Sequence, residues 1–401
     1  MLPKLSNLIA PKVSSNSRGQ KVESQGFFKN LINSVVGVFI GILLIFGSCF
    51  LLFWNEVRAN AADAAKAASE LTASNASSLQ NQSVWVKGAL TGTGVELDKF
   101  LNSNTDKKYI YLSRNMERYV WVENEKRTSK DKAGGGTETV ITYEYNLRWS
   151  SSTPDSSRFK GPDAGSKQNP AEKQGYTGFS WIADDLRIGS FGLSDELSFS
   201  GASSAFTPTA ANVAKGLFFN GRYIYENEKS ISSPALGDYR VSYSFIENNT
   251  GGIVLGKLSG DHVERLDFKS AGVVKTSSSI YRFFNVSAIS EVIEILQNEH
   301  SVGKIFGRIF GFILSMIGFA MLFGPIKTIA GIIPILKKVT GKVIQFIAIL
   351  LSIALSIIVI IIANIINNII ALLVVLALVG GLIAYGVYRG KQKKAATVTN
   401  A

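Results

Sequence analysis

The sequence predicts a membrane protein of the α+β class, with four transmembrane helices and one large β-rich domain. One helix lies near the N-terminus, three lie near the C-terminus, and the domain lies between the first and the second. Three observations lead to this prediction: four long apolar blocks, a surplus of basic residues confined to three short segments, and strand-like alternation in the region between the first two blocks.

Four apolar blocks are each long enough to cross a membrane as a helix. They are residues 35–54, 309–326, 343–363 and 369–388, and each has 18 to 21 residues and almost no charge. An α-helix rises about 1.5 Å per residue, so about 20 residues cross the ~30 Å hydrocarbon layer. These blocks account for much of the 46% hydrophobic composition of the chain.

The first block has an alternative interpretation, a cleavable secretory signal, because Ala59-Asn60-Ala61 matches the small-residue cleavage pattern. The apolar core of a signal is about 7 to 15 residues long. This block has 20 apolar residues and follows a 34-residue head. We therefore expect a retained membrane anchor.

The formal net charge of +12 is confined to three segments outside the domain. The head, residues 1–34, has a net charge of +4, and the loop 327–342 and the tail 389–401 carry four basic residues each and no acidic residue. Positively charged flanks stay on the cytoplasmic side, so we expect both termini there. Residues 55–308 and the uncharged turn 364–368 are then periplasmic or extracellular in a prokaryote, or lumenal in a eukaryote. This distribution also argues against a nucleic-acid partner.

The domain, residues 55–285, begins with an alanine-rich stretch and then changes to strand patterns. Residues 59–83 include AADAAKAASEL, a good helix former with little to bury, which predicts a short helical stalk. Residues 139–150 alternate apolar and polar side chains, as a half-buried strand does. Together with a strand over YVWVENE at 119–125, they predict a β-hairpin.

Further strands are expected at 84–90, 109–113, 186–191, 221–226, 238–246 and 252–258. A polar stretch with prolines, residues 151–178, predicts a long surface loop. Residues 286–308 then change to helical spacing, with an apolar face and Ser287 able to cap. We expect this juxtamembrane helix to run almost directly into the second span.

The sequence contains no recognisable catalytic, cofactor or metal-binding motif. His262 and His300 are too few and too far apart for a histidine-based metal site. The stretch GGIVLGKL resembles a phosphate-binding loop but has Leu258 where a hydroxyl would bind magnesium. The one cysteine, Cys49, lies in the first span, so the domain has no disulfide. We therefore expect no cofactor and no enzymatic activity.

Glycines in the spans predict close helix packing. Gly37 and Gly41 form a GxxxG pattern in the first span, and Gly307 and Gly311 repeat it at the start of the second. Small residues allow close backbone approach between helices in lipid. The alternative, that glycine is simply common in spans, fits the pattern equally well.

Several stretches together resemble the transmembrane protein 43 family, also called LUMA. They are LLFWNEVRA at the end of the first span, RYVWVENEKR and YEYNLRW in the hairpin, SSRF to SKQNP, LRIGSFGLS, LGDYRVSYSF, and the helix before the C-terminal spans. The resemblance covers about residues 30–390. It singles out Asn169, Pro170, Gly237, Asp238 and Arg240 as motif residues of the domain.

The resemblance implies one N-terminal span, a large lumenal or extracytoplasmic domain and three C-terminal spans. Its eukaryotic members reside in endoplasmic reticulum and inner nuclear membranes, where they organise other membrane proteins and bind themselves. Prokaryotic relatives would lie in the bacterial inner membrane. The leading hypothesis is therefore a non-enzymatic, oligomeric scaffold that lies in the lipid bilayer and binds other membrane proteins.

A second hypothesis is a sensor or ligand-binding receptor. Aromatic side chains on the strands could line a pocket for a small molecule or an envelope component: Tyr143, Tyr145, Trp149, Tyr239, Tyr243 and Phe245. An ordinary core explains them more simply, because one apolar face is what any sheet must bury.

The stretch LLFWNEVRAN passes from apolar to charged residues without a loop signal. Trp54 favours the membrane interface, and Asn55, Glu56 and Arg58 would be the first residues in water. Since Glu56 and Arg58 are too close in sequence to face each other along one helix side, we expect them to contact the β-rich domain.

Overall fold

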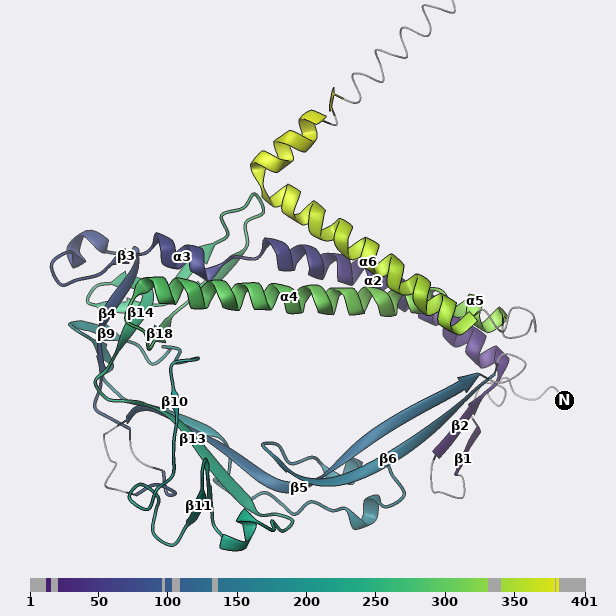
Figure 1. The fold of residues 1–401 in the computed structure, drawn as a ribbon, viewed down its shortest axis with the longest axis horizontal. Coiled ribbons are helices and arrows are strands. Elements are labelled where there is room, and N and C mark those ends of the chain that lie inside the picture. The colour runs from purple at the N-terminus through teal and green to yellow at the C-terminus, as the bar shows by residue number, and fades with distance from the viewer. Residues whose placement is uncertain are drawn as a thin grey trace, which may run out of the picture.

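In the computed structural model, a layer of long helices lies opposite a curved, β-rich domain (Figure 1). The structure describes residues 12–15, 21–95, 98–102, 109–131, 136–330, 340–378, 380 and 381. The helices are α2 (Phe27–Val57), α3 (Ala61–Ala67), α4 (Ile289–Leu322), α5 (Gly324–Ala330) and α6 (Thr340–Asn367). Short 3₁₀ turns lie at Ala76–Leu79, Ser156–Arg158, Ala164–Ser166 and Glu228–Ile231.

Three of these helices, α2, α4 and α6, are long and apolar enough to cross a membrane. α2 and α6 contain the first and third predicted spans, and α4 contains residues 309–322 of the second. The fourth predicted span, residues 369–388, is not shown as such. The described residues of this block include an apolar helix over Ile369–Leu378, and residues 379 and 382–388 lie outside the described part of the chain. The tail 389–401 and most of the loop 327–342 also lie outside it.

The predicted juxtamembrane helix and second span form one uninterrupted helix, α4, of 34 residues. Ala288, rather than Ser287, is its N-cap residue. The Glu291 carboxylate accepts hydrogen bonds from the Ala288 N–H and the Ser287 hydroxyl, each at 3.0 Å. The predicted end of the second span at residue 326 is wrong. The helix ends at Leu322 and α5 begins at Gly324, so that Pro325 occupies a first turn, where its missing N–H is tolerated.

The larger sheet has the strand order β1-β2-β6-β5-β13-β12-β11 among the described residues, with β10 beside β13 and β7 beside β5. Its strands are β1 (Lys12–Ser15), β2 (Lys21–Gln25), β5 (Tyr109–Asp131), β6 (Thr137–Ser150), β7 (Phe179–Ile182), β10 (Ser204–Ala205), β11 (Phe218–Asn220), β12 (Tyr223–Tyr225) and β13 (Tyr239–Glu247). The predicted hairpin is present as β5 and β6, which pair from Arg118 with Ser150 to Asp131 with Thr137. However, β5 is one strand of 23 residues rather than two short ones.

The smaller sheet nearly encloses part of the core, because the path β14-β15-β9-β8-β4 returns to β14. Its strands are β3 (Ser69–Glu70), β4 (Ser83–Thr91), β8 (Arg187–Ile188), β9 (Phe191–Leu193), β14 (Thr250–Ser259), β15 (His262–Glu264) and β18 (Arg282–Phe284). The strand expected at 186–191 is instead the tight β8–β9 pair. A separate pair is formed by β16 (Leu266–Lys269) and β17 (Ser277–Ile280). The predicted loop 151–178 has only two short 3₁₀ turns.

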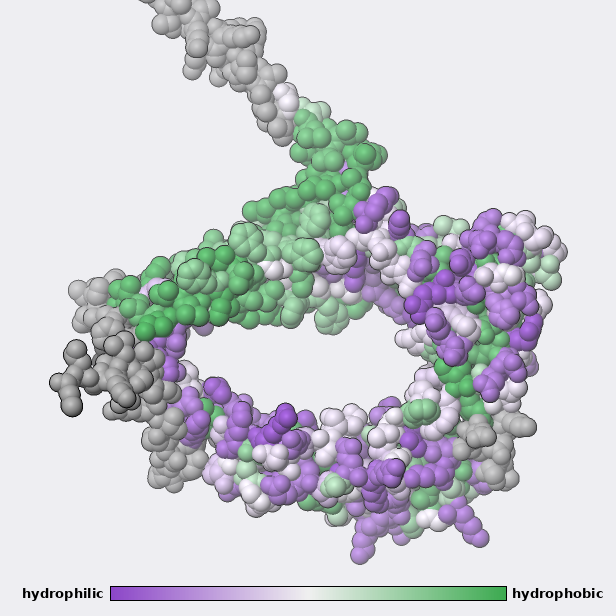
Figure 2. Space-filling model, turned by 180° about the vertical axis from the view of Figure 1, so that it is seen from behind, coloured by the Kyte–Doolittle hydropathy of each residue, from purple (hydrophilic) through white to green (hydrophobic). Residues whose placement is uncertain are grey.

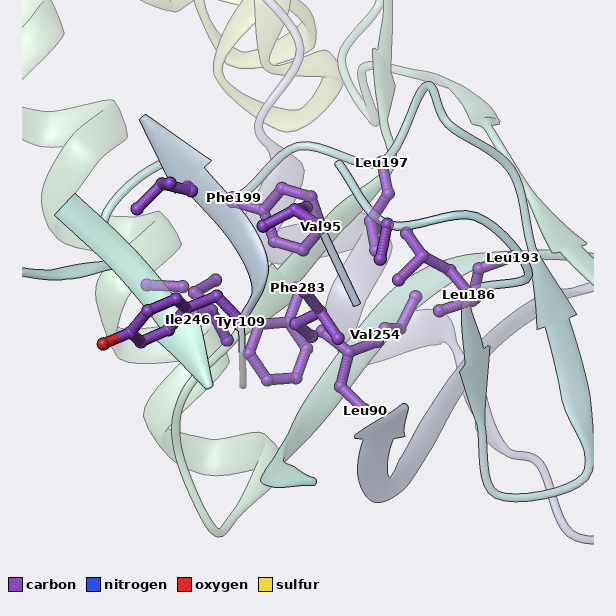
Figure 3. Close-up of a cluster of buried hydrophobic side chains, with 14 of the residues drawn as sticks. Leu90, Val95, Tyr109, Leu186, Leu193, Leu197, Phe199, Ile246, Val254 and Phe283 are labelled. Carbon is purple, nitrogen blue, oxygen red and sulfur yellow. The ribbon is translucent and has the colours of Figure 1, made fainter. Parts of the chain in front are cut away.

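One main core lies between the two sheets and contains Leu90, Tyr109, Phe199, Val254 and Phe283 (Figure 3). Phe283 is completely buried in it. The core therefore joins strands from both ends of the domain sequence into one folded unit.

A second cluster corrects the prediction of a stalk over 59–83. Only Ala61–Ala67 is helical, as α3, and Ala62 and Ala65 are buried with Val292 and Leu296 of α4. Alanines bury little area each, but a surface of alanines lets a neighbouring helix approach closely. The stretch therefore packs into the domain instead of projecting as a stalk.

The hairpin extends beyond the domain as the β5–β6 arm, residues 119–131 and 137–150. It runs opposite α2 and α4 and returns to the N-terminal end of α2 (Figure 1), where β2 pairs with β6 from Lys21 with Ile141 to Gln25 with Thr137. Seen as a solid, an apolar helical layer and a polar arm enclose an opening (Figure 2). This pairing joins residues of the head 1–34 to residues of 55–308, two segments that the charge distribution predicts on opposite sides of the membrane.

Candidate functional site

The charge at the end of α2 is paired with charges on α4. The Glu56 side chain is 1% exposed, and its carboxylate accepts hydrogen bonds from Arg308 Nε at 2.7 Å and Nη2 at 2.8 Å. Lys304 Nζ lies 3.8 Å from the same carboxylate. A bidentate pair of this kind fixes two helices in register as well as neutralising the charge.

Two neighbours of Glu56 bind the backbone of α4. Asn55 Nδ2 donates to the Lys304 carbonyl oxygen at 2.9 Å, and Arg58 Nη2 donates to the His300 carbonyl oxygen at 2.7 Å. Trp54, by contrast, is half exposed and stacks on Phe50, with ring centroids 6.1 Å apart. We call the polar residues where α2 meets α4 the boundary cluster: Asn55, Glu56, Arg58, His300, Lys304 and Arg308.

We expected Glu56 and Arg58 to contact the β-rich domain, but the hydrogen bonds above join both side chains to α4. The reason is that α4 continues past the end of α2 as an unbroken helix and is the nearest partner. Among the described residues, the Val57 carbonyl oxygen joins this end of α2 to the domain, since it accepts a hydrogen bond from Thr276 Oγ1 at 3.0 Å.

Three of the four predicted packing glycines lie at close contacts between α2 and α4. A Cβ atom on Gly41 would lie 2.6 Å from the Gly318 carbonyl oxygen, and one on Gly311 would lie 2.6 Å from Leu52. Gly307 lies directly against Asn55. Gly37 has more room, since its nearest neighbour, Met321 Cε, would be 3.7 Å away. We call this interlocked surface the α2–α4 seam. The predicted glycine pairs therefore contribute to packing between helices of the same molecule.

The turn 364–368 lies against a loop of the domain. Asn367 accepts hydrogen bonds from the N–H groups of Val273, at its carbonyl oxygen, and Val274, at Oδ1, both at 3.1 Å. Residues of this turn line a cavity of about 610 Å³ together with Glu56 and Lys304. The contact joins the turn to the domain, two segments that the charge distribution predicts on the same side of the membrane.

The motif residue Asn169, in the loop 151–178, binds the arm at Trp121. Its Oδ1 accepts from the Trp121 N–H at 2.8 Å and its Nδ2 donates to the Trp121 carbonyl oxygen at 3.0 Å. The same Nδ2 donates to the Pro154 carbonyl oxygen at 3.1 Å. β13 begins opposite Arg118, so Trp121 lies beyond the part of β5 that pairs with β13. The side-chain amide of Asn169 takes the place of a peptide group from a neighbouring strand at this position.

Gly237 and Asp238 form backbone hydrogen bonds with Tyr119, two residues before Trp121 on β5. The Gly237 N–H donates to the Tyr119 carbonyl oxygen at 2.9 Å, and the Tyr119 N–H donates to the Asp238 carbonyl oxygen at 2.8 Å. Gly237 has φ +92°, which a residue with a Cβ rarely adopts. A Cβ there would also lie 3.0 Å from Pro170 Cγ.

The two motifs, 67 positions apart, therefore meet on one edge of β5. We call Asn169, Pro170, Gly237 and Asp238 the strand clamp. The Asp238 carboxylate closes the turn before β13, since Oδ2 accepts from Ser230 Oγ at 2.6 Å and from the Ala235 N–H at 2.8 Å. The clamp fixes the direction in which the arm leaves the domain.

The fifth motif residue, Arg240, connects the clamp region to the aromatic side chains of the sheet. Its Nε donates to Glu117 Oε2 at 2.7 Å. Its guanidinium lies 3.8 Å from the Tyr223 ring centroid and 4.6 Å from that of Trp149. Ion pairing and cation–π contact together give this residue a role in packing.

The six aromatic residues proposed as pocket lining do not converge on one cavity. Tyr239 and Tyr243 lie in the main core, and burial, followed by the Asp98 charge, raises the pKa of Tyr243. Phe245 packs against the same core and also lines a cavity of about 290 Å³, whereas Tyr143, Tyr145 and Trp149 belong to β6.

Tyr145 anchors the long loop to the arm. Its hydroxyl donates to Glu123 Oε2 at 2.6 Å, and that oxygen also accepts from the N–H groups of Lys160 at 2.6 Å and Gly161 at 3.0 Å. Burial, followed by the Glu123 hydrogen bond, raises the pKa of Tyr145 to about 12. Burial would raise the pKa of Glu123, but the hydrogen bonds from Tyr145, Gly161 and Lys160 outweigh it and lower that pKa.

Sequence reasoning missed the partners on α4: His300, Lys304 and Arg308. A signal was present, because Arg308 directly precedes the second apolar block and Glu56 closely follows the first. Two opposite charges at matched depth in neighbouring spans would be expected to pair. The strand clamp had no such signal, since only the folded sheet brings its two parts together.

Comparison with known proteins gives one family. The family model described as "Transmembrane protein 43" matches residues 118–368, from within β5 to the end of the 364–368 turn. The strand clamp, Arg240, α4 and α6 lie inside that range, whereas Trp54, Asn55, Glu56 and Arg58 lie outside it. No solved structure matches the chain.

The curated relatives carry the same name. Transmembrane protein 43 of Mus musculus is 30% identical over 249 residues, which cover 58% of this chain and 59% of the relative. Transmembrane protein 43 of Homo sapiens is 30% identical over 240 residues, which cover 56% and 57%. The match thus spans less than two thirds of the length of these relatives. With a family match over more than half of its own length, this chain belongs to the transmembrane protein 43 family.

Proposed function

We propose that this chain is a non-enzymatic membrane scaffold that self-associates and binds other membrane proteins, in the endoplasmic reticulum of a eukaryote or the inner membrane of a bacterium. The observation that carries the proposal is the continuity of α4. Its first turns bury Val292 and Leu296 in the domain, and the same helix continues as an apolar span. A partner that binds the domain is thereby linked rigidly to the membrane helices.

We further propose that α2 crosses the membrane, with the termini cytoplasmic and residues 55–308 on the opposite side. The contact between Asn367 and the domain loop supports this orientation. The β2–β6 pairing opposes it. If α2 spanned the bilayer while β2 stayed paired, the β5–β6 arm would have to pass through the hydrocarbon layer with unpaired backbone groups at its edges.

The energies favour the spanning state. An apolar residue at the centre of a span contributes about 0.3 to 0.6 kcal/mol to insertion, so the first block contributes roughly 6 kcal/mol. Each cross-strand pair contributes about 0.2 to 1 kcal/mol, and β2 makes five such pairs with β6. Carrying Lys126, Arg127 and Lys130 of the arm into lipid would cost about 3 kcal/mol each. We therefore expect β2 to separate from β6 when α2 is inserted.

Self-association needs a surface other than the glycine pairs, because the α2–α4 seam uses them. α2 presents a stripe of large, exposed side chains at alternating spacings of four and three: Phe39, Leu43, Phe46 and Phe50, each 66–70% exposed. This spacing is that of a helix–helix packing seam. We propose that the stripe packs against the same stripe of a second copy.

Cysteine crosslinking in native membranes tests the self-association. In a Cys49→Ala background, Leu43→Cys and Phe46→Cys should form disulfide-linked dimers on mild oxidation. Leu52→Cys, whose position is completely buried against α4, is the matched control and should stay monomeric. Monomers from all three variants, together with a monomer in native mass spectrometry, would contradict the scaffold proposal.

A further inference from the structure

A cavity of about 340 Å³ lies where α2 leaves its apolar stretch, between α3, α4 and the β16–β17 pair. We propose that it binds the phosphate of an anionic phospholipid headgroup at the non-cytoplasmic membrane surface. This assigns a lipid ligand and goes beyond the proposed scaffold function. Its lining residues include Trp54, Arg58, Phe268, Ser278, Leu296 and His300.

Arg58 supplies the charge. Among the described residues its guanidinium makes one hydrogen bond, from Nη2 to the His300 carbonyl oxygen, and forms no ion pair. Its Nε is buried without a partner. A partly buried cation with most of its donors unused is unfavourable unless an anion approaches.

The carboxylates near Arg58 are engaged elsewhere. Glu56 accepts both hydrogen bonds of Arg308. Glu299, which also lines the cavity, is bound by Arg282 Nη1 through both carboxylate oxygens, at 3.0 and 2.9 Å. The anion that neutralises Arg58 must therefore come from outside these described pairs.

The remaining walls indicate a lipid as the source of that anion. Trp54, half exposed at the end of the first apolar block, forms one wall, and Phe268 and Leu296 add apolar surface. Ser277 and Ser278 of β17 also line the cavity. A phosphate beside Arg58 would leave the glycerol and upper acyl carbons against Trp54, where an indole ring prefers to lie. A free phosphate ion has no apolar part that could pack against these apolar walls.

Native mass spectrometry of the full-length protein, titrated in detergent with phosphatidylglycerol, tests the proposal. Arg58→Gln should weaken the tightest phosphatidylglycerol site about tenfold, which is the loss of one charge-assisted hydrogen bond. Lys66→Gln removes the same charge from the exposed face of α3 and is the matched control, with an affinity equal to that of the unmodified protein. Millimolar inorganic phosphate should not displace the lipid.

A second variant separates binding from folding, because Arg58 also packs against Gly303 of the seam. Ser278→Phe, at an exposed position of β17, should fill the cavity while Arg58 remains, and should weaken the same site without changing the thermal unfolding midpoint. Unchanged phosphatidylglycerol affinity in both variants would overturn the proposal. Displacement by inorganic phosphate would overturn the lipid assignment, and neither result would bear on self-association.

Discussion

The α2–α4 seam and the β5–β6 arm lie on opposite sides of one opening, and they are held in opposite ways (Figure 2). The seam is interlocked by close glycine contacts and by the ion pair between the buried Glu56 carboxylate and Arg308. The arm is polar, and outside its own hairpin it is held mainly by the strand clamp, by Glu123 and, at its tip, by β2. The difference teaches that the seam should remain intact in any state of the protein, whereas the tip of the arm can separate without loss of the core.

The largest loss of stability is expected when the ion pair between Glu56 and Arg308 in the seam is removed. Arg308→Met leaves the Glu56 carboxylate buried with only the more distant Lys304, and should lower the free energy of unfolding by about 3 kcal/mol. The thermal unfolding midpoint in detergent measures this. The control is Arg265→Met, which breaks an exposed pair with Glu196 and should cost less than ~1 kcal/mol. Equal losses of unfolding free energy in the two variants would show that the Glu56–Arg308 pair contributes no more to stability than an exposed ion pair does.

The next effect concerns the close approach of the two helices. Gly41→Val forces a side chain against the Gly318 backbone and should destabilise the protein by about 2 kcal/mol. Gly47→Val, on the same helix, is the control, since the nearest atom to its Cβ would be Leu314 Cδ2 at 4.0 Å. Thermal unfolding that ranks Gly47→Val at or below Gly41→Val in stability would refute the packing of α2 on α4.

A smaller effect is expected where the arm leaves the domain. Asn169→Ala leaves the Trp121 N–H and carbonyl oxygen without protein partners and should cost about 1 kcal/mol, because water can partly replace the amide. Hydrogen exchange at Trp121 should become faster, while exchange in the main core stays unchanged. Glu172→Ala, a nearby exposed change, should alter neither. Faster exchange throughout the core would mean that the clamp holds the whole domain and not the arm alone.

The smallest effect is a pH dependence of the arm. The folded-state pKa of Tyr145 is raised to about 12, so its contribution to stability is complete below its unfolded value near 10 and is lost as pH rises toward 12. The pKa of Glu123 is lowered, so its contribution is present above about pH 4.5 and is lost as pH falls below that value. Tyr145→Phe should abolish the alkaline loss, as measured by unfolding at several pH values. An alkaline loss of equal size in the variant would exclude Tyr145 as its source.

The sequence predicted those features that depend on local pattern. Alternation at 139–150 indicated β6, the helical face before the second block indicated the start of α4, and GxxxG spacing indicated the glycine contacts of the seam. The sequence did not predict contacts between segments that are far apart along the chain. Gly237 approaches Pro170, and Glu56 pairs with Arg308, only because the sheet and the helices bring them together. β2 was missed because five mostly polar residues give too short a pattern.

We propose that α2 crosses the membrane and that the β2–β6 pairing is absent in that state. Val22 and Val140 are register partners in the described pairing, at a separation that suits a disulfide. A Val22→Cys, Val140→Cys double variant in a Cys49→Ala background is therefore oxidised in native membranes, and each single variant is treated with an impermeant thiol reagent. We predict that the double variant forms no disulfide. We also predict that residues 22 and 140 are labelled from opposite sides of the membrane. A disulfide in high yield, or labelling of both from one side, would contradict this proposal.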